Sequence, residues 1–307
     1  MLAVSWAPLF EPGFFSSEPV HVALTVGAIS AVVSGVVGVF TVIRGQSFAG
    51  HALSDIGTAG GSASFLVGTS TLYGFVAFNV VAAGVMELIG IRKPRGRDLA
   101  TGIVLGASLG LAALFLYEGT ISSSTTGATV NVLFGSIFTL APGIMNVIAV
   151  LGFVSVSLIA VLYRPLLLSS VSYEMAAARR VPVRLVGAGY LLALALAVSM
   201  SAVTIGAILS TALLIGPAAV ALRVATRTGV AIAVAAVVGV VACWAGTLIA
   251  YDSTVWAGGN GWPVSFCIVV VIFVLYFTSG VVSRLRADPR PATTSDLGRF
   301  VEPVEAA

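Results

Sequence analysis

The chain has 307 residues, of which 58% are hydrophobic and 9% are charged, and a further 34 residues are glycine. Soluble domains carry about 25% charged residues, so this composition, with a mean hydropathy of +1.09, excludes a water-soluble protein and indicates an integral membrane protein. The apolar runs are apolar on every face, which argues against an outer-membrane barrel, whose strands alternate polar and apolar residues.

Nine apolar runs follow one another along the chain, each near the length of about 20 residues that a helix needs to cross a bilayer. They cover residues 22–43, 50–70, 72–91, 99–117, 143–163, 185–202, 204–222, 229–250 and 263–283. The two runs that meet at residues 202–204 could form one broken element, so the range is eight to ten. The sequence therefore predicts an all-α, polytopic bundle of about nine transmembrane helices.

The 15 basic residues fix the orientation that we expect in the membrane. If the amino terminus lies outside, every Lys and Arg falls in a cytoplasmic connection or in the carboxy-terminal tail, as the positive-inside rule requires. We therefore predict an outer amino terminus, a membrane domain over residues 1–285 and a disordered cytoplasmic tail over residues 286–307. The basic residues are Arg44, Arg92, Lys93, Arg95, Arg97, Arg164, Arg179, Arg180, Arg184, Arg223, Arg227, Arg284, Arg286, Arg290 and Arg299.

Two common kinds of site are excluded by the residue counts. Lys93, the one lysine, is followed by Pro94, so the chain lacks the GxxxxGK[ST] loop with which many ATPases bind phosphate. We expect no enzyme activity, and any ATP must be used by another chain. The two cysteines, Cys243 and Cys267, lie inside apolar runs, so neither a disulfide framework nor a cysteine metal site is expected.

Three ionisable residues, His51, Asp55 and Glu87, lie within the predicted spans. A charged side chain at the centre of a membrane helix costs about 2.5–3.5 kcal/mol on insertion scales, so such residues are candidates for function. Glu87 is near the cytoplasmic end of its span, beside Arg92 and Lys93. We expect it to be an ion-paired or snorkelling residue at the membrane interface.

His51 and Asp55 form the candidate site, because residues four apart share one helix face, about 6 Å from each other. An imidazole nitrogen and a carboxylate oxygen together suit Zn, Mn or Fe better than Ca or Mg. Gly57, Gly60 and Gly61 follow, and they would permit a locally unwound helix. One chain supplies two ligands, and a two-fold pair of chains would supply four. Spacing alone leaves three interpretations open: a metal site, a proton relay, or a pair that fixes helix packing.

Four segments, in order along the chain, resemble signatures of the ABC-3 family of metal-ion ABC transporter permeases, of the zinc, manganese or iron type. Residues 38–55 read GVFTVIRGQSFAGHALSD, where the family commonly has GVFxVLRRxSLxGDAxSHAVLPG. Residues 133–137 (LFGSI) are similar to LFGSIL, and residues 173–182 (YEMAAARRVP) to FDPExARxxGLP. Residues 203–221 resemble VGxLLxxALLxxPAAxA, so the likeness covers nearly the whole chain.

One departure from the family pattern concerns the candidate site. His51 stands where the family has aspartate, and Asp55 stands where it has histidine. The usual proline that follows is replaced by the stretch from Gly57 to Gly61. Both ligand types remain on one helix face, so the resemblance still implies that His51 and Asp55 bind the metal, with a changed geometry.

The resemblance implies a permease subunit in the bacterial plasma membrane. Such a subunit carries a divalent Zn, Mn or Fe ion as its substrate and holds no permanent cofactor. Its expected partners are a separate ATPase, an extracytoplasmic metal-binding protein and a second permease, identical or different, and no nucleic acid. Segment 172–182 would be the coupling helix that contacts the ATPase, and Gly216 with Pro217 would break a membrane helix. The residues assigned to coupling are Tyr173, Glu174, Met175, Ala176, Arg179 and Arg180.

Other functions remain to be weighed against this one. An ABC permease for a metal chelate, of the siderophore or cobalamin type, would need a wider pathway and no protein ligands. A secondary transporter would use His51 and Asp55 as a proton relay. A purely structural or receptor role leaves the cost of intramembrane charge without a use.

Overall fold

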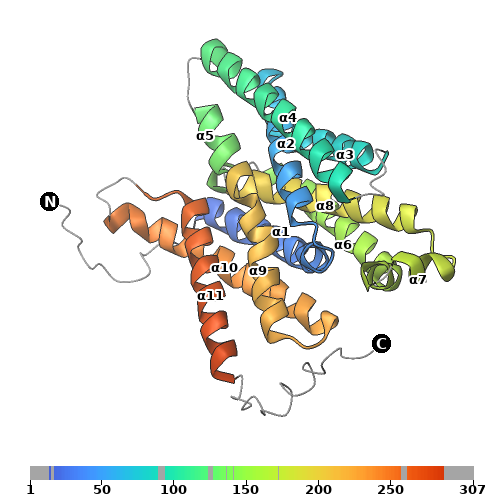
Figure 1. Cartoon of the computed structure of the whole chain (residues 1–307). Coiled ribbons are helices and arrows are strands. Elements are labelled where there is room, and N and C mark those ends of the chain that lie inside the picture. Colours follow the sequence, from blue (N-terminus) through green and yellow to red (C-terminus); the bar gives the residue numbers. More distant parts are fainter. Residues whose placement is uncertain are drawn as a thin grey trace, which may run out of the picture.

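The computed structural model describes residues 14, 17–88, 94–123, 127–135, 137–140, 142–171, 173–256 and 261–286. Within these residues every regular element is a helix, which confirms the predicted all-α class (Figure 1). The elements are α1 (Glu18–Ile43), α2 (Ser47–Leu66), α3 (Thr71–Leu88), α4 (Pro94–Ser123), α5 (Gly127–Phe134), the short 3₁₀ helix η2 (Ile137–Thr139), α6 (Pro142–Val171), α7 (Tyr173–Ala178), α8 (Val183–Ile205), α9 (Ala207–Val224), α10 (Thr228–Trp256) and α11 (Val264–Arg286).

Each of the nine predicted runs coincides with one helix, but not all nine are equally apolar. Within the described residues, seven helices are long and apolar enough to cross a membrane: α1, α3, α6, α8, α9, α10 and α11. The helix α2 is rich in glycine and serine and carries His51 and Asp55, and α4 contributes a shorter apolar stretch, Leu105–Ile121. The count of nine spans therefore stays a prediction.

Two central helices, α1 and α8, join two groups of helices. In Figure 1, α2, α3 and α4 lie to one side and α9, α10 and α11 to the other. The helix α1 packs against α6, α8, α9 and α10, while α8 also packs against α3, α6 and α9. The most apolar window of α8 is 78% buried, against 22% for α6 and for α11. The outer faces of α6 and α11 are thus apolar and suited to lipid contact.

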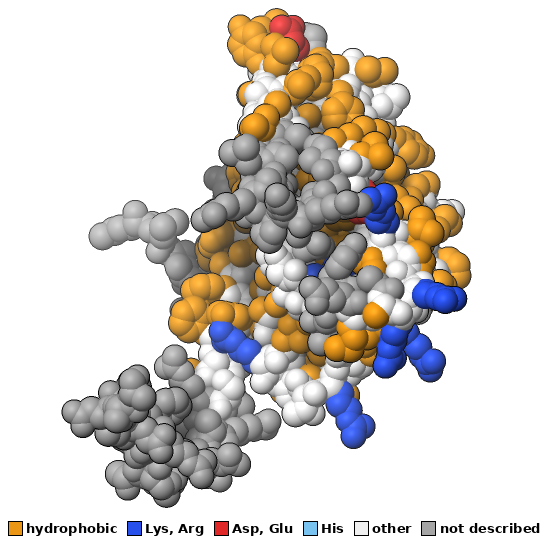
Figure 2. Space-filling view, turned by 45° about the vertical axis from the view of Figure 1, so that its right-hand side comes forward, with side chains coloured by type: hydrophobic (Ala, Val, Ile, Leu, Met, Phe, Trp, Pro, Cys, Tyr) orange, Lys and Arg blue, Asp and Glu red, His pale blue; other side chains and the backbone are white. Residues whose placement is uncertain are grey.

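Residues that the topology places on the same side of the membrane lie together. At the end of α1, the Arg44 guanidinium donates to Ser169 Oγ of α6 at 3.0 Å and lies 5.1 Å from the ring centre of Tyr190 in α8. The beginnings of α1 and α11 and the end of α10 line one hollow. In Figure 2 the basic side chains occur mainly in the lower half of the view. These groupings agree with helices that alternate in direction, and which end faces the cytoplasm stays a prediction.

Some of the predicted features lie outside the described residues. One is the chain beyond Arg286, which makes up most of the tail that we expect to be disordered. Another is the basic pair Arg92 and Lys93. The division into residues 1–285 and 286–307 therefore remains a prediction.

The glycines of α2 allow a neighbouring helix to approach closely. A Cβ atom placed on Gly74 of α3 would lie 2.0 Å from the carbonyl oxygen of Gly60, and one placed on Gly61 would lie 2.5 Å from the Phe75 ring. The helix α2 continues without interruption through these glycines, from Ser47 to Leu66. The expectation of a locally unwound helix at Gly57 to Gly61 is therefore wrong, because these residues serve helix packing.

This packing leads to a prediction on stability. Gly74→Ala is expected to destabilise the chain by at least about 1–3 kcal/mol, because the added methyl group overlaps the backbone of α2. Gly84→Ala is the matched control on the same helix, since a Cβ there meets no atom within 4 Å. Each variant is heated in detergent, and the temperature at which half of the monodisperse gel-filtration peak is lost is its unfolding midpoint. The difference between the two midpoints measures the effect. Equal midpoints for the two variants would contradict the packing role.

The helix break lies earlier than the sequence suggested. The helix α9 runs through Gly216 and Pro217 without ending, so the prediction of a break at these residues is wrong. The chain breaks instead at Gly206, between α8 and α9, where φ is 88°. Gly135, with φ of 81°, packs against this junction, and a Cβ on it would lie 2.5 Å from the Thr204 carbonyl oxygen. Both positions need glycine, for their φ and for the close contact.

Candidate functional site

The predicted pair lies together on α2, as the four-residue spacing requires. His51 Nε2 and Asp55 Oδ2 are 3.6 Å apart, which is longer than a hydrogen bond of about 2.7–3.2 Å. Two ligand atoms that are each about 2.1 Å from a shared ion lie about 3.0 Å apart at a right angle and about 3.4 Å apart at the tetrahedral angle. The observed separation is therefore close to that of two ligands of one ion.

The helix α9 forms the second wall of this site. Ser54 Oγ donates to the Ala207 carbonyl oxygen at the first turn of α9, and it lies 2.6 Å from Ser210 Oγ. One residue further along α9, Thr211 Oγ1 is 3.3 Å from His51 Nδ1. The two ring nitrogens of His51 thus face different groups, Thr211 on one side and Asp55 on the other.

The site is open on one side. The side chain of His51 is 49% exposed and that of Asp55 is 16% exposed. Two apolar residues of the helices that form the site, Phe48 of α2 and Ile208 of α9, are also about half exposed. Among the described residues, no group of three or more His, Cys, Asp or Glu side chains is placed to hold a metal ion. The described part of one chain therefore offers two ligands on an uncovered face.

Glu87 is not part of this site. It lies at the end of α3, where it interacts electrostatically with Arg184 of α8 and Arg44 of α1. A Cβ placed on Gly187 would come 3.1 Å from the Glu87 carboxylate, so this carboxylate packs on α8. The interaction with basic side chains fits the expectation of an ion-paired residue, and the described partners come from other helices.

The predicted coupling segment forms the short helix α7, which packs on α6 and α8. Ala176 is fully buried, whereas Met175, Arg179 and Arg180 are exposed. After the helix, Arg180 takes a left-handed conformation with φ of 57°, and Val181 N–H donates to the Ala176 carbonyl oxygen. The larger exposed side chains described in this segment are therefore those of Met175, Arg179 and Arg180.

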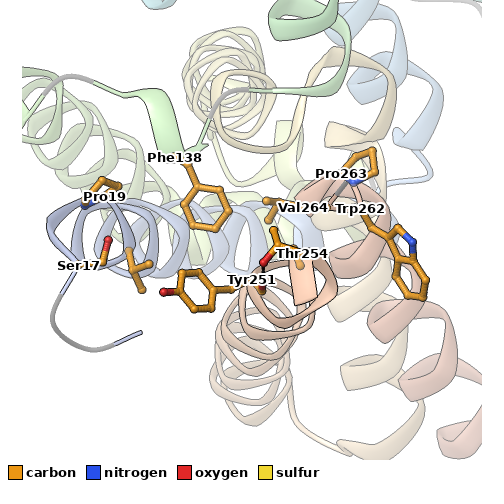
Figure 3. A pocket seen from close by; sticks show the side chains of 11 residues that line it. Ser17, Pro19, Phe138, Tyr251, Thr254, Trp262, Pro263 and Val264 are labelled. Atoms are coloured by element: carbon orange, nitrogen blue, oxygen red, sulfur yellow. Dashed lines mark hydrogen bonds between the residues drawn. The ribbon is translucent and has the colours of Figure 1, made fainter. Parts of the chain in front are cut away.

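A hollow of about 410 Å³ lies at the other end of the helices. Figure 3 shows Phe138 and Tyr251 pointing toward a common space, with Trp262 at the rim. A second hollow of about 400 Å³ shares Phe138 and Pro263 with the first and adds Phe134 of α5. The sequence interpretation missed both α5 and the hollows. His51 and Asp55 line neither hollow.

Residues 16–283 match the family described as the ABC 3 transport family. The chain belongs to the ABC 3 transport family. This confirms the resemblance found in the four sequence segments. Their order in the chain and the matched range agree, since the match begins before α1 and ends within α11.

Curated relatives of this ABC 3 chain carry transport names. It is 27% identical over 162 residues to the "manganese transport system membrane protein MntC" of Listeria monocytogenes, covering 53% of this chain and 56% of that protein. It is 30% identical over 148 residues to the "manganese import system permease protein ScaB" of Streptococcus parasanguinis, covering 48% and 51%. The chain thus spans about half the length of the curated relatives it matches.

Two solved structures have the same fold. PsaBC from Streptococcus pneumoniae in complex with Fab matches with a TM-score of 0.72 and 24% identity, over 87% of this chain and 92% of that one. The structure described as "an inward-facing conformation of a putative metal-chelate type ABC transporter" matches with a TM-score of 0.70 and 18% identity, over 91% of each chain. The permease fold is therefore confirmed, while the cargo is not decided by fold.

Proposed function

We propose that this chain is the membrane-spanning permease subunit of an ABC importer that carries a divalent transition-metal ion, manganese first, into the bacterial cytoplasm. The observation that carries the proposal is the His51–Asp55 pair, which lies on one face of α2 in a member of the ABC 3 family. Nitrogen and oxygen ligands suit Mn, Zn and Fe. The names of the relatives favour manganese among these three.

The exchanged order of the two ligands is compatible with this role. Positions 51 and 55 are one helical turn apart, so either order brings an imidazole and a carboxylate to the same face. The separation of 3.6 Å needs only a small adjustment of the side chains to place both on one ion. A packing pair would instead be expected to share a hydrogen bond, which is absent between these two side chains.

A second permease would complete the coordination of the ion. Two ligands are too few to replace the water around a divalent cation, and His51 is half exposed beside apolar residues. A second copy of this chain that covers this face would bring another His51 and Asp55, giving four protein ligands. A related permease that carries its own histidine and aspartate ligands would complete the site in the same way.

Transport would be driven from outside this chain. The chain has no phosphate-binding lysine motif, so a separate ATPase subunit hydrolyses ATP in this proposal. The helix α7 and the turn after it would contact that subunit through the exposed side chains of Met175, Arg179 and Arg180. An extracytoplasmic metal-binding protein would deliver the ion at the opposite side, and residues 286–307 would form a cytoplasmic tail.

The proposed contact with the ATPase leads to a prediction. Met175→Asp is expected to lower copurification of the ATPase at least tenfold, because a carboxylate replaces an apolar side chain that the contact would bury. Thr226→Asp is the matched control, since Thr226 is exposed in another connection on the predicted cytoplasmic side. The amount of ATPase retained by the purified permease measures the effect. Equal retention by both variants would exclude α7 as the contact.

A second candidate is a permease for a metal chelate, which is favoured only by the likeness to the metal-chelate type transporter. Proteoliposomes that contain this chain and its ATPase distinguish the two. We expect uptake of free Mn²⁺ that requires ATP and that is unaffected by an imposed pH gradient. Uptake of chelated metal with no competition by free Mn²⁺ would support the chelate permease. Uptake without ATP, driven by a pH gradient, would support a secondary transporter.

A further inference from the structure

We propose that Thr211 of α9 is a positioning residue that holds the His51 imidazole with its Nε2 atom toward Asp55 and the transported ion. The inference rests on the proposed function, because it concerns the same site. Its basis is a contact across two helices: Thr211 Oγ1 lies 3.3 Å from His51 Nδ1, while His51 Nε2 faces Asp55 Oδ2 at 3.6 Å.

The contact between α2 and α9 explains why Thr211 reaches the ring. Ser54 binds both the Ala207 carbonyl oxygen and Ser210 Oγ in a buried seam, which fixes the two helices against each other. Successive residues point about 100° apart around a helix. Ser210 therefore lies in the buried seam, while Thr211 lies at its edge, partly exposed and beside His51.

The chemistry of the imidazole gives this contact a consequence for metal binding. A neutral imidazole has one N–H group and one nitrogen with a free lone pair, and only the second can bind a metal ion. If the Thr211 hydroxyl accepts the Nδ1–H, the lone pair of His51 lies on Nε2, which is the nitrogen that faces Asp55. Histidines that bind metals generally donate their other N–H to such an acceptor.

Packing alone does not hold the ring in this orientation. The side chain of His51 is 49% exposed, so few surrounding atoms restrict its rotation. The only hydrogen bond described for its ring is the one with Thr211. Loss of the Thr211 hydroxyl would remove the described partner of Nδ1 and leave Asp55 as the remaining polar group described beside the ring, which favours an N–H on Nε2.

Affinity for Mn²⁺ tests the proposal. In purified permease reconstituted in nanodiscs, Thr211→Val is expected to raise the Kd for Mn²⁺ about 10–100-fold, the range typical of outer hydrogen-bond partners of metal ligands. Thr211→Ser keeps the hydroxyl and is expected to stay within about threefold of the wild type. Thr278→Val is the matched control on α11, where the hydroxyl bonds to carbonyl groups of its own helix.

The protonated nitrogen of His51 provides a readout that a change in packing would not move. The chain has 2 histidines, so ¹⁵N-histidine labelling gives signals from His21 and His51 alone, with His21 as the internal reference. With the site saturated by diamagnetic Zn²⁺, wild type and Thr211→Ser are expected to show His51 protonated at Nδ1, with Nε2 bound to the metal. Thr211→Val is expected to move the proton toward Nε2.

Two results would overturn the proposal. One is a Thr211→Val protein with the affinity and the His51 signals of the wild type, and the other is a Thr211→Ser protein as weak as Thr211→Val. His51→Ala, measured in parallel, separates this failure from that of the proposed function. If His51→Ala binds Mn²⁺ normally, the site itself is wrong, whereas loss of binding in His51→Ala alone rejects only the role of Thr211.

Discussion

Asp55→Ala is expected to lower ATP-driven uptake of Mn²⁺ by more than about 100-fold, a larger loss than that for an outer partner of a metal ligand. The substitution removes one of the two candidate ligands and the only carboxylate of the pair. The fold is expected to survive, because the Asp55 side chain is partly exposed and makes no described hydrogen bond to another helix. Uptake of radioactive manganese into proteoliposomes with the ATPase measures the loss.

Two controls make this result specific to the site. Glu18→Ala removes an exposed carboxylate from the start of α1 and is expected to leave uptake unchanged. Asp55→Asn keeps the shape of the side chain while removing its charge, and is expected to lose most of the uptake. Assembly of each variant with the ATPase is checked by gel filtration. Normal uptake by Asp55→Ala in an assembled complex would reject the assignment of the site.

Exchanging the two ligands is expected to restore binding that each single exchange removes. His51→Asp places two carboxylates on the face of α2, and Asp55→His places two imidazoles there. Each is expected to weaken Mn²⁺ binding at least tenfold, because charge and ligand type both change. The double variant again has one of each ligand type, in the order usual for the family, and is expected to bind within about tenfold of the wild type.

This comparison depends on the difference between the two positions. Position 51 is half exposed and beside Thr211, whereas position 55 is mostly covered. A shift in preference between Mn²⁺ and Zn²⁺ in the double variant would therefore measure how the exchanged order affects selectivity. A double variant as weak as the worse single variant would show that His51 and Asp55 do not act as one pair of ligands. Metal titration of the purified proteins decides between these outcomes.

The sequence was sufficient to predict the helices and the pairing of His51 with Asp55, because both depend on local patterns. Apolar runs set the positions of the spans, and a spacing of four residues places two side chains on one helix face. The sequence did not predict the contacts between helices. Gly60 was expected to permit local unwinding, but the structure shows that Gly60 and Gly74 allow α2 and α3 to touch.

The second wall of the site is another feature that no local pattern shows. Ser210 lies 156 residues from Ser54, and Thr211 lies 160 residues from His51. Ordinary polar residues in a membrane helix carry no signal of their partners.

The junction between two spans, expected at residues 202–204, lies at Gly206, whereas the break expected at Gly216 and Pro217 is absent. A proline removes one hydrogen bond yet is tolerated within a packed membrane helix. Gly206, in contrast, combines a φ of 88° with a close approach to Leu133 and Phe134 of α5, which the sequence does not show.

The most direct measurement of the central claim is pulsed electron paramagnetic resonance of Mn²⁺ bound to the purified permease. A nitrogen ligand produces a modulation from the ¹⁴N nucleus. The chain has only His21 and His51 as sources of imidazole nitrogen. We expect the modulation in the wild type and in His21→Ala, and its loss in His51→Ala. Bound Mn²⁺ without nitrogen modulation in the wild type, or with unchanged modulation in His51→Ala, would contradict the proposed site.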